Sequence, residues 1–119
     1  MQKHSKRFLL QFALESITQI ENYIEGLSFG TFTREALPHD ATILRLQFLG
    51  FALRDLSKRF RTEDTKRYLA RKAQRYNTLT EDYRAVDYQE IWETATLELP
   101  RLKRKLQSLI LRDAIKKKG

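Results

Sequence analysis

The residues best suited to chemistry lie between Tyr76 and Trp92, where the chain passes from the end of one predicted helix into the start of the next. This stretch holds an amide, paired carboxylates and several tyrosines within a few turns. The adjacent carboxylates Glu81 and Asp82 could share a proton, although such a pair is more often a solvated helix end. An active site, if the chain has one, is therefore expected here.

Tyr83 is the second residue of interest in this stretch. It lies four residues before Asp87, which forms a predicted capping box with Glu90 at the start of the following helix. The Tyr83 hydroxyl could face a cleft between the two helices and serve as a target or ligand for a bound molecule. A tyrosine at a helix junction can equally be a core residue whose hydroxyl bonds to backbone. From the residues alone we predict a core position.

Metal and cofactor sites find little support in the sequence. The chain has two histidines, His4 and His39, no cysteine, and no histidine pair at helical spacing, so the usual ligands of a zinc site are missing. It also lacks a glycine-rich phosphate loop and a nucleophile elbow. We expect His39, beside Asp40 near a helix start, to be partly exposed, and we expect no metal and no cofactor.

The elements that would position these residues are helices, because apolar residues recur at three- and four-residue steps and no strand pattern competes. The predicted helices run from about Lys6 to Glu25, from Pro38 to about Phe60, from the cap candidates at 62–65 to about Thr80, and from Asp87 onward. Four helices with short connections favour an all-α, antiparallel up-down four-helix bundle.

Further details of this bundle can be predicted. Gly26 should end the first helix as a left-handed stop, and Phe29 and Phe32 should enter the core from the connection at 26–37. Pro100 lies inside the apolar pattern of the last helix and should kink it. The second helix carries an extra apolar row and should be covered on two sides; that row is Ala41, Leu44, Phe48 and Ala52.

Charge is distributed unevenly along the chain, whose net charge is +8. Residues 54–75 carry a net charge of +6 and residues 101–119 carry +7, while residues 76–100 carry −5. Basic surfaces attract polyanions such as RNA, and solvated helix faces rich in Lys and Arg are an equally good explanation. The candidate RNA-binding residues are Arg71, Lys72, Arg75, Lys103 and Arg104.

Length and composition favour a single domain over residues 1–119, with a basic frayed tail at about 112–119. The absence of cysteine fits a reducing compartment. No run approaches the roughly 18 apolar residues of a membrane span, and no cleavage site follows the basic N-terminus. We therefore expect a cytoplasmic protein without a membrane partner.

The second half of the chain resembles the HepT group of HEPN-domain proteins, the toxin partners of minimal nucleotidyltransferases. The motif of that family is Arg-Asn, three mostly apolar residues, His, any residue and Tyr, then Asp after three more residues, and later Trp and Leu-Pro-x-Leu. Asn77, Tyr83 and Asp87 stand at the Asn, Tyr and Asp positions. Ile91-Trp92 and Leu99-Pro100-Arg101-Leu102 match in register.

The resemblance extends upstream and spans roughly residues 17–109. Phe32 and the segment 41–52 resemble a family segment that ends Gly-Glu-Ala. The fold implied is a helical HEPN-like domain, and the assembly implied is a homodimer. In relatives, Arg and His from two subunits meet across the dimer interface and cleave RNA without metal. His moves the proton and Arg stabilises the phosphorane.

The departures from the family pattern fall on the catalytic positions. Tyr76 stands at the Arg position, with Arg75 one residue early, and Glu81 stands at the His position. Phe51 replaces the Glu of Gly-Glu-Ala. An unshifted glutamate titrates at about 4.3 and its charge repels a phosphodiester. The resemblance therefore implies a nuclease whose activity is lost or much weakened.

Three interpretations remain open. In the leading one, the chain is an RNA-directed, homodimeric HepT-like protein of a toxin–antitoxin-type module. Its partner nucleotidyltransferase would adenylylate Tyr83, and Asn77 would hold the local geometry. In the second, the chain is an active metal-independent endoribonuclease, with Arg75 and Asn77 on phosphate and Glu81 or Tyr83 as a substitute base. In the third, it is a non-catalytic RNA- or protein-binding helical module.

Overall fold

The structure is a computed structural model that describes residues 4–118. Its elements are α1 (Lys6–Ile24), α2 (Phe29–Arg34), α3 (Ala36–Ser57), α4 (Glu63–Thr80), α5 (Tyr88–Glu93), the π-helical turn η1 (Thr94–Glu98) and α6 (Leu99–Lys118). No strand occurs in these residues, which confirms the all-α prediction. The tail predicted to fray is helical as far as Lys118, and Gly119 lies outside the described residues.

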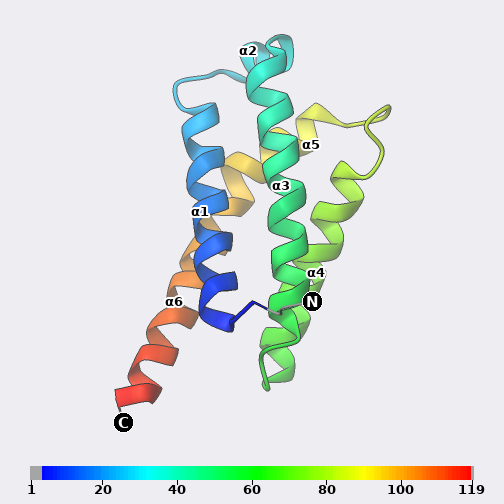
Figure 1. Cartoon of the computed structure of the whole chain (residues 1–119). Helices are drawn as coiled ribbons and strands as arrows, with labels where there is room; N and C mark the ends of the chain where they lie inside the picture. The colour runs from blue at the N-terminus through cyan, green and yellow to red at the C-terminus, as the bar shows by residue number, and fades with distance from the viewer. Residues whose placement is uncertain (1–3, 119) are drawn as a thin grey trace.

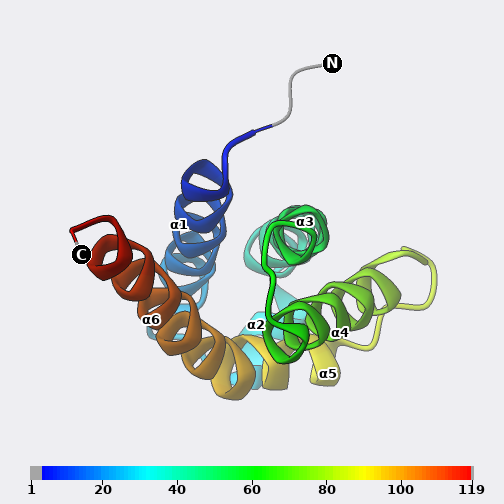
Figure 2. The same ribbon diagram turned by 90° about the horizontal axis from the view of Figure 1, so that it is seen from below.

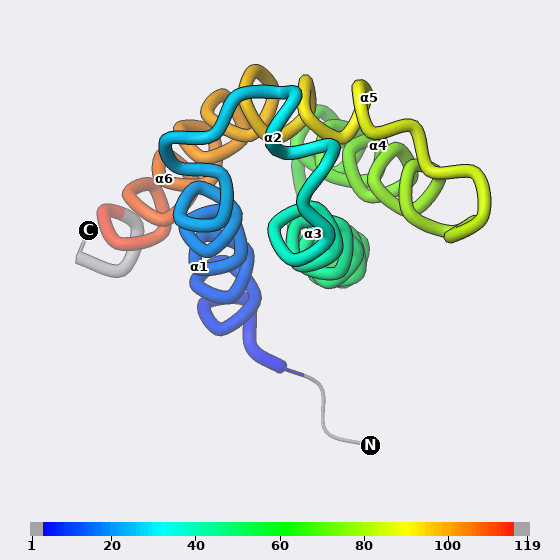
Figure 3. Tube along the Cα trace, turned by 90° about the horizontal axis from the view of Figure 1, so that it is seen from above, coloured from blue at the N-terminus to red at the C-terminus, as the bar shows by residue number. Residues whose placement is uncertain are grey.

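The long helices alternate in direction. In Figure 1, α1 rises, α3 descends beside it and α4 rises again, while α6 descends behind α1. Seen along the helices, α6, α1, α3 and α4 follow one another in an open arc (Figures 2 and 3), and α5 with η1 crosses one side of it from α4 to α6. One hydrophobic core joins all four long helices.

Local signals explain where the first helices begin and end. The Ser5 hydroxyl accepts a hydrogen bond from the Phe8 amide at 3.0 Å and caps α1. Gly26 has φ +75°, so the predicted left-handed stop is confirmed. The connection after it contains α2, which we did not predict, and whose start is capped by the Ser28 hydroxyl at 3.1 Å from the Thr31 amide.

Two aromatic predictions for this connection had different outcomes. Phe32 is fully buried as expected, whereas Phe29 is 39% exposed. The prediction that His39 is partly exposed is wrong, since the side chain is buried. Its Nδ1 lies 3.0 Å from the Phe32 carbonyl oxygen, and its ring stacks on Tyr88 at a centroid distance of 4.5 Å. These contacts pin α2 and α5 against the start of α3.

The second apolar row of α3 is not covered on both sides as predicted. Ala52 is buried, but Leu44 is 51% exposed and Phe48 is 38% exposed. The packing partners of α3 are chiefly α1 and α4, and these contacts leave Leu44 and Phe48 exposed. An apolar face therefore remains open on α3.

Two backbone features fix the position of α4 and the last helix. A Cβ on Gly50 would lie 3.4 Å from the Tyr76 Cβ and 3.5 Å from the Ala73 carbonyl oxygen, so the glycine lets α3 and α4 approach closely. The kink predicted at Pro100 takes the form of η1, where the Leu99 amide bonds to the Thr94 carbonyl five residues earlier. The wider turn accommodates a proline that cannot donate a hydrogen bond.

None of the described helices combines the length and the apolar character that crossing a membrane requires.

Candidate functional site

Helix α4 carries most of the residues singled out by the sequence, and it presents them on two different flanks. Its buried stripe is Thr65, Leu69, Ala73, Tyr76 and Thr80. At 100° per residue, Asn77 and Glu81 lie on one side of this stripe, whereas Lys72 and Arg75 lie on the other. We call the first side the motif flank and the second the groove flank.

On the motif flank, an amide and a carboxylate meet at the surface. The Asn77 Nδ2 donates to the Glu81 Oε2 at 3.4 Å, and both side chains are exposed. The backbone nitrogen of Asn77 would lie 3.7 Å from a Cβ on Gly50, so this flank borders α3. Glu81 caps the C-terminal end of α4 and is exposed to solvent. None of the ion pairs among the described residues includes its carboxylate.

Tyr76, at the position where the resemblance places an arginine, is a core residue. Its side chain is fully buried, and its hydroxyl has no hydrogen-bond partner among the described residues. Burial, with a further contribution from the negative charge of Glu98, raises the pKa of the Tyr76 hydroxyl far above its ordinary value. A buried neutral phenol supplies neither a cation for a phosphate nor a base.

Arg75, one residue before the position where the resemblance places an arginine, is paired with Glu98. Its Nε donates to the Glu98 Oε2 at 2.8 Å, and the Lys72 Nζ donates to the Glu98 Oε1 at 3.0 Å. Burial acts to raise the pKa of the Glu98 carboxyl, but the hydrogen bonds and charges of these two cations outweigh it and lower the pKa. The structure therefore holds Arg75 on the groove flank, apart from Asn77 and Glu81.

Tyr83 is the clearest correction to the sequence-based prediction. It is 85% exposed, the most exposed of the large apolar side chains described, and not part of the core. A tight turn presents it: the Asp82 Oδ1 accepts from the Arg84 amide at 3.0 Å and from the Arg84 Nε at 3.1 Å. The predicted cap at Asp87 is confirmed, since its Oδ1 accepts from the Gln89 and Glu90 amides at 3.0 and 3.2 Å.

The candidate RNA-binding residues divide between two places. Arg71, Lys72 and Arg75 line an open groove of about 480 Å³ along α4. Lys103 instead faces α1, where its Nζ donates to the Glu21 Oε1 at 2.8 Å. Arg104 is exposed on α6 and is not among the residues that line the groove.

The groove also contains residues that sequence reasoning missed. Tyr68, Arg67 and Asp64 line it, and Lys105 reaches it from α6, with its Nζ 5.7 Å from the centre of the Tyr68 ring. The four-residue spacing of Tyr68 and Lys72 was visible in the sequence. The contribution from α6 was not.

An apolar groove of about 230 Å³ lies between α1 and α3. Phe8, Phe48 and Phe51 are all 38% exposed or more, and Leu9 with Ala52 forms its buried floor. Sequence reasoning placed Phe48 under cover and so missed this surface. We call these exposed phenylalanines and the groove between them the aromatic face.

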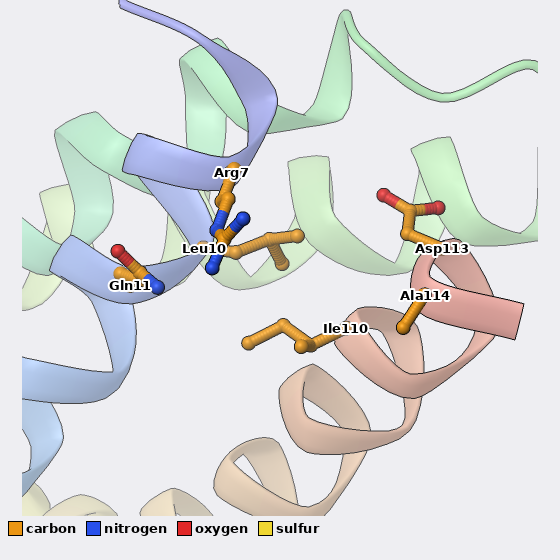
Figure 4. A pocket seen from close by; sticks show the side chains of 6 residues that line it. All are labelled: Arg7, Leu10, Gln11, Ile110, Asp113 and Ala114. Atoms are coloured by element: carbon orange, nitrogen blue, oxygen red, sulfur yellow. The ribbon is translucent and has the colours of Figure 1, made fainter. Parts of the chain in front are cut away.

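A smaller cavity of about 170 Å³ separates α1 from α6 (Figure 4). Side chains from the first turns of α1 face Ile110 and its neighbours on α6, and an ion pair between Lys6 and Asp113 at 3.3 Å lies beside it. None of the motif positions lines this cavity. Among residues 4–118, no group of three or more His, Asp or Glu side chains could hold a metal ion.

An all-helical chain with this motif spacing is compatible with a HepT-like helical bundle. Comparison with known families agrees: the model of the family described as "Ribonuclease HepT-like" matches residues 13–109. The chain therefore belongs to the HepT-like ribonuclease family.

Individual relatives support the same assignment. The chain is 26% identical to a protein of Caldanaerobacter subterraneus subsp. tengcongensis named "Putative RNase" over 104 residues, which cover 87% of this chain and 93% of the relative. It is 26% identical to a Methanocaldococcus jannaschii protein with the same designation over 110 residues, which cover 92% and 91%. A third relative, from the same archaeon, is named "Gamma-glutamylcyclotransferase and putative RNase"; the match, 28% identical, covers 87% of this chain and 47% of that protein. No solved structure matches the chain significantly.

Proposed function

We propose that this protein is an RNA-directed, homodimeric member of the HepT-like family in which RNA cleavage is lost or strongly weakened. In this proposal it belongs to a toxin–antitoxin-type module with a nucleotidyltransferase partner. The observation that carries the proposal is the state of the two catalytic positions. One holds the buried Tyr76 and the other holds the exposed Glu81.

Metal-independent RNA cleavage needs a proton-transfer group and a cation close to the scissile phosphate. A histidine suits the first task near neutral pH, and an arginine suits the second because its charge is permanent. Glu81 is an exposed carboxylate, and Arg75 is bound to Glu98 on the opposite flank of α4. On the motif flank, neither requirement is met by the residues described.

The first experiment measures cleavage directly. Purified protein, in excess over end-labelled RNA and in the presence of chelator, should leave the RNA intact. Cleavage that disappears in Glu81→Gln but persists in the neighbouring control Asp82→Asn would instead establish the second interpretation, an active nuclease with a substitute base. Intact RNA that is nevertheless bound, with affinity that falls steeply as salt rises, agrees with the proposal.

The homodimer is supported by the aromatic face. Phe8, Phe48 and Phe51 are exposed together on adjacent helices, which is unusual for a surface that stays in water. A stable interface of this kind buries about 800 Å² on each partner.

The nucleotidyltransferase partner is supported by the exposure of Tyr83. An acceptor tyrosine must present its hydroxyl to another enzyme, and Tyr83 is 85% exposed in a turn between two helices. In the proposed reaction, the Tyr83 hydroxyl attacks the α-phosphate of ATP, an oxygen–phosphorus bond forms, pyrophosphate leaves and the phenolic proton passes to a base. The protein would gain one adenylyl group per modified tyrosine.

Mass spectrometry tests this part separately from RNA cleavage. Incubation with a cognate minimal nucleotidyltransferase and ATP should add adenylyl mass to the wild type. Tyr83→Phe should abolish the addition, and Tyr23→Phe, which changes a tyrosine on α1, should not. Equal modification of wild type and Tyr83→Phe would remove Tyr83 from the proposal.

A further inference from the structure

The groove flank of α4 concentrates positive charge that the motif flank lacks. The groove is lined by four cations and Asp64, while Glu98 and Lys105 contact its lining residues from η1 and α6. Five cations therefore face two carboxylates, which gives the groove a net charge of +3. The arginines of the lining lie four residues apart on one helical face, so they follow the groove in a row; they are Arg67, Arg71 and Arg75.

Tyr68 adds an aromatic surface to this row of cations. Its side chain is partly buried and packs against the core, so its position is fixed. The Nζ atoms of Lys72 and Lys105 each lie 5.7 Å from the centre of its ring. Cation–π contacts of partly exposed lysines are weak. A phosphate can therefore draw the lysines away from the Tyr68 ring, and the ring is then free to stack on a base.

Glu98 holds two of the groove cations ready. Its carboxylate accepts from Lys72 at 3.0 Å and from Arg75 at 2.8 Å, and the Thr94 hydroxyl donates to it at 3.3 Å. One carboxylate facing two cations leaves a charge of +1 in this cluster. Arg75 is 44% exposed and Lys72 is 26% exposed, so both can reach a ligand in the groove.

We propose that this groove binds single-stranded RNA, with its cations on successive phosphates and Tyr68 against an unpaired base. Glu98 acts as an internal anion that orients Lys72 and Arg75 and competes with the phosphates for them. The inference rests on the proposed RNA-directed function and specifies where the RNA binds. A cationic groove combined with an aromatic platform is the usual arrangement for binding single strands without strong sequence preference.

Duplex RNA fits this groove less well. The bases of a duplex are stacked and their faces are covered, so an aromatic side chain reaches only unpaired bases. The groove also runs along a single helix and offers one row of arginines, which suits one phosphate backbone. We therefore expect the single strand to bind more tightly than a duplex of the same length.

The first test removes groove charge. A double variant, Arg71→Gln with Arg75→Gln, is compared with the charge-matched control Arg7→Gln with Arg34→Gln, whose residues are exposed on α1 and α2. The probe is a short fluorescent single-stranded RNA of mixed sequence, titrated by anisotropy between about 50 and 200 mM salt. The slope of log affinity against log salt changes by about −0.7 for each phosphate contact. Each lost cation therefore weakens binding about fivefold at 0.1 M salt relative to 1 M, and the slope of the groove variant becomes shallower by about 1.4.

For two further positions, the proposal predicts effects on RNA binding that a merely structural role of the groove residues would not produce. Glu98→Gln removes the competing anion and should tighten RNA binding by about fivefold, by the same arithmetic. Tyr68→Leu should weaken binding of the single strand, while Tyr68→Phe, which keeps the ring, should restore it. Thermal melting of each variant shows that the folded protein is being titrated.

The outcomes separate this inference from the proposed function. If the groove double variant binds RNA as tightly as the wild type does, the proposed binding site in the groove is overturned, while an RNA-directed function still stands. Weaker binding in Glu98→Gln overturns its assigned role as a competing anion. Wild-type protein that fails to bind RNA at low salt overturns both.

Discussion

Replacing Tyr76 with phenylalanine should stabilise the protein. The Tyr76 side chain is fully buried and its hydroxyl has no partner among the described residues. An unsatisfied buried polar group costs about 1–3 kcal/mol, and phenylalanine keeps the ring that packs against Gly50. We therefore expect the free energy of unfolding to rise by about 1 kcal/mol or more, which for a chain of this size raises Tm by about 3–6 °C.

Urea and thermal denaturation measure this change, with Tyr88→Phe as the control. Tyr88 is partly exposed and stacks on His39, so removal of its hydroxyl should change stability by less than about 0.5 kcal/mol. Destabilisation of Tyr76→Phe by a kilocalorie or more would refute the reasoning, because it would show that the hydroxyl has a hydrogen-bond partner in the assembled protein. The family's arginine position would then again be a candidate for a functional role.

Three further predictions concern the site and its surroundings. Glu81→His alone should not restore metal-independent cleavage of labelled RNA, because the missing cation is worth about 10²–10³-fold in rate; robust cleavage by this variant would contradict that. Phe48→Asp should convert the proposed dimer to a monomer in sedimentation velocity, and Leu111→Asp, a change at a more exposed apolar position on α6, should not. The pKa of Glu98 is lowered from 4.5, so its contribution to stability is present above that pH and is lost as pH falls through the lowered value. Glu98→Gln should therefore melt below wild type at neutral pH, and the difference should shrink in acid; a constant difference would argue against it.

Much of the fold was predictable because it depends on local signals. The predicted first helix ends within a residue of α1, and the predicted end of the third helix coincides with the end of α4 at Thr80. Caps and stops are encoded within a few residues, as at Gly26 and Asp87. The short helix α2 escaped prediction because six residues give too little periodicity. At Pro100 the sequence predicted a disruption of the helix but not its π-helical form.

The candidate site was less predictable, because burial depends on neighbours that are distant in sequence. Phe48 has the same apolar character whether α1, α4 or a second subunit covers it, so its exposure could not be inferred. Tyr83 was assigned to the core from its type, while the turn around Asp82 carries it into solvent. The pairing of Arg75 with Glu98 spans 23 residues, and only the path of η1 brings the two together.

The two flanks of α4 connect the proposed loss of cleavage with the proposed mode of binding. A cleaving enzyme must hold the phosphodiester beside its proton-transfer group, which the resemblance to the HepT group places at the position of Glu81. Here that flank presents a carboxylate, whereas Arg75 lies across the buried stripe around Tyr76. Arg71 lies between Glu81 and Arg75 on the exposed face of α4. An RNA strand follows the positive potential, so its backbone would lie in the groove and away from Asn77. Restoring a histidine would then be insufficient for a second reason beyond chemistry: at 100° per residue, position 81 lies about 120° around α4 from Arg75, so the restored base would not face the bound strand. In this proposal, an active nuclease binds and cleaves RNA on one side of the helix. Here the binding cations and position 81 lie on different sides of α4.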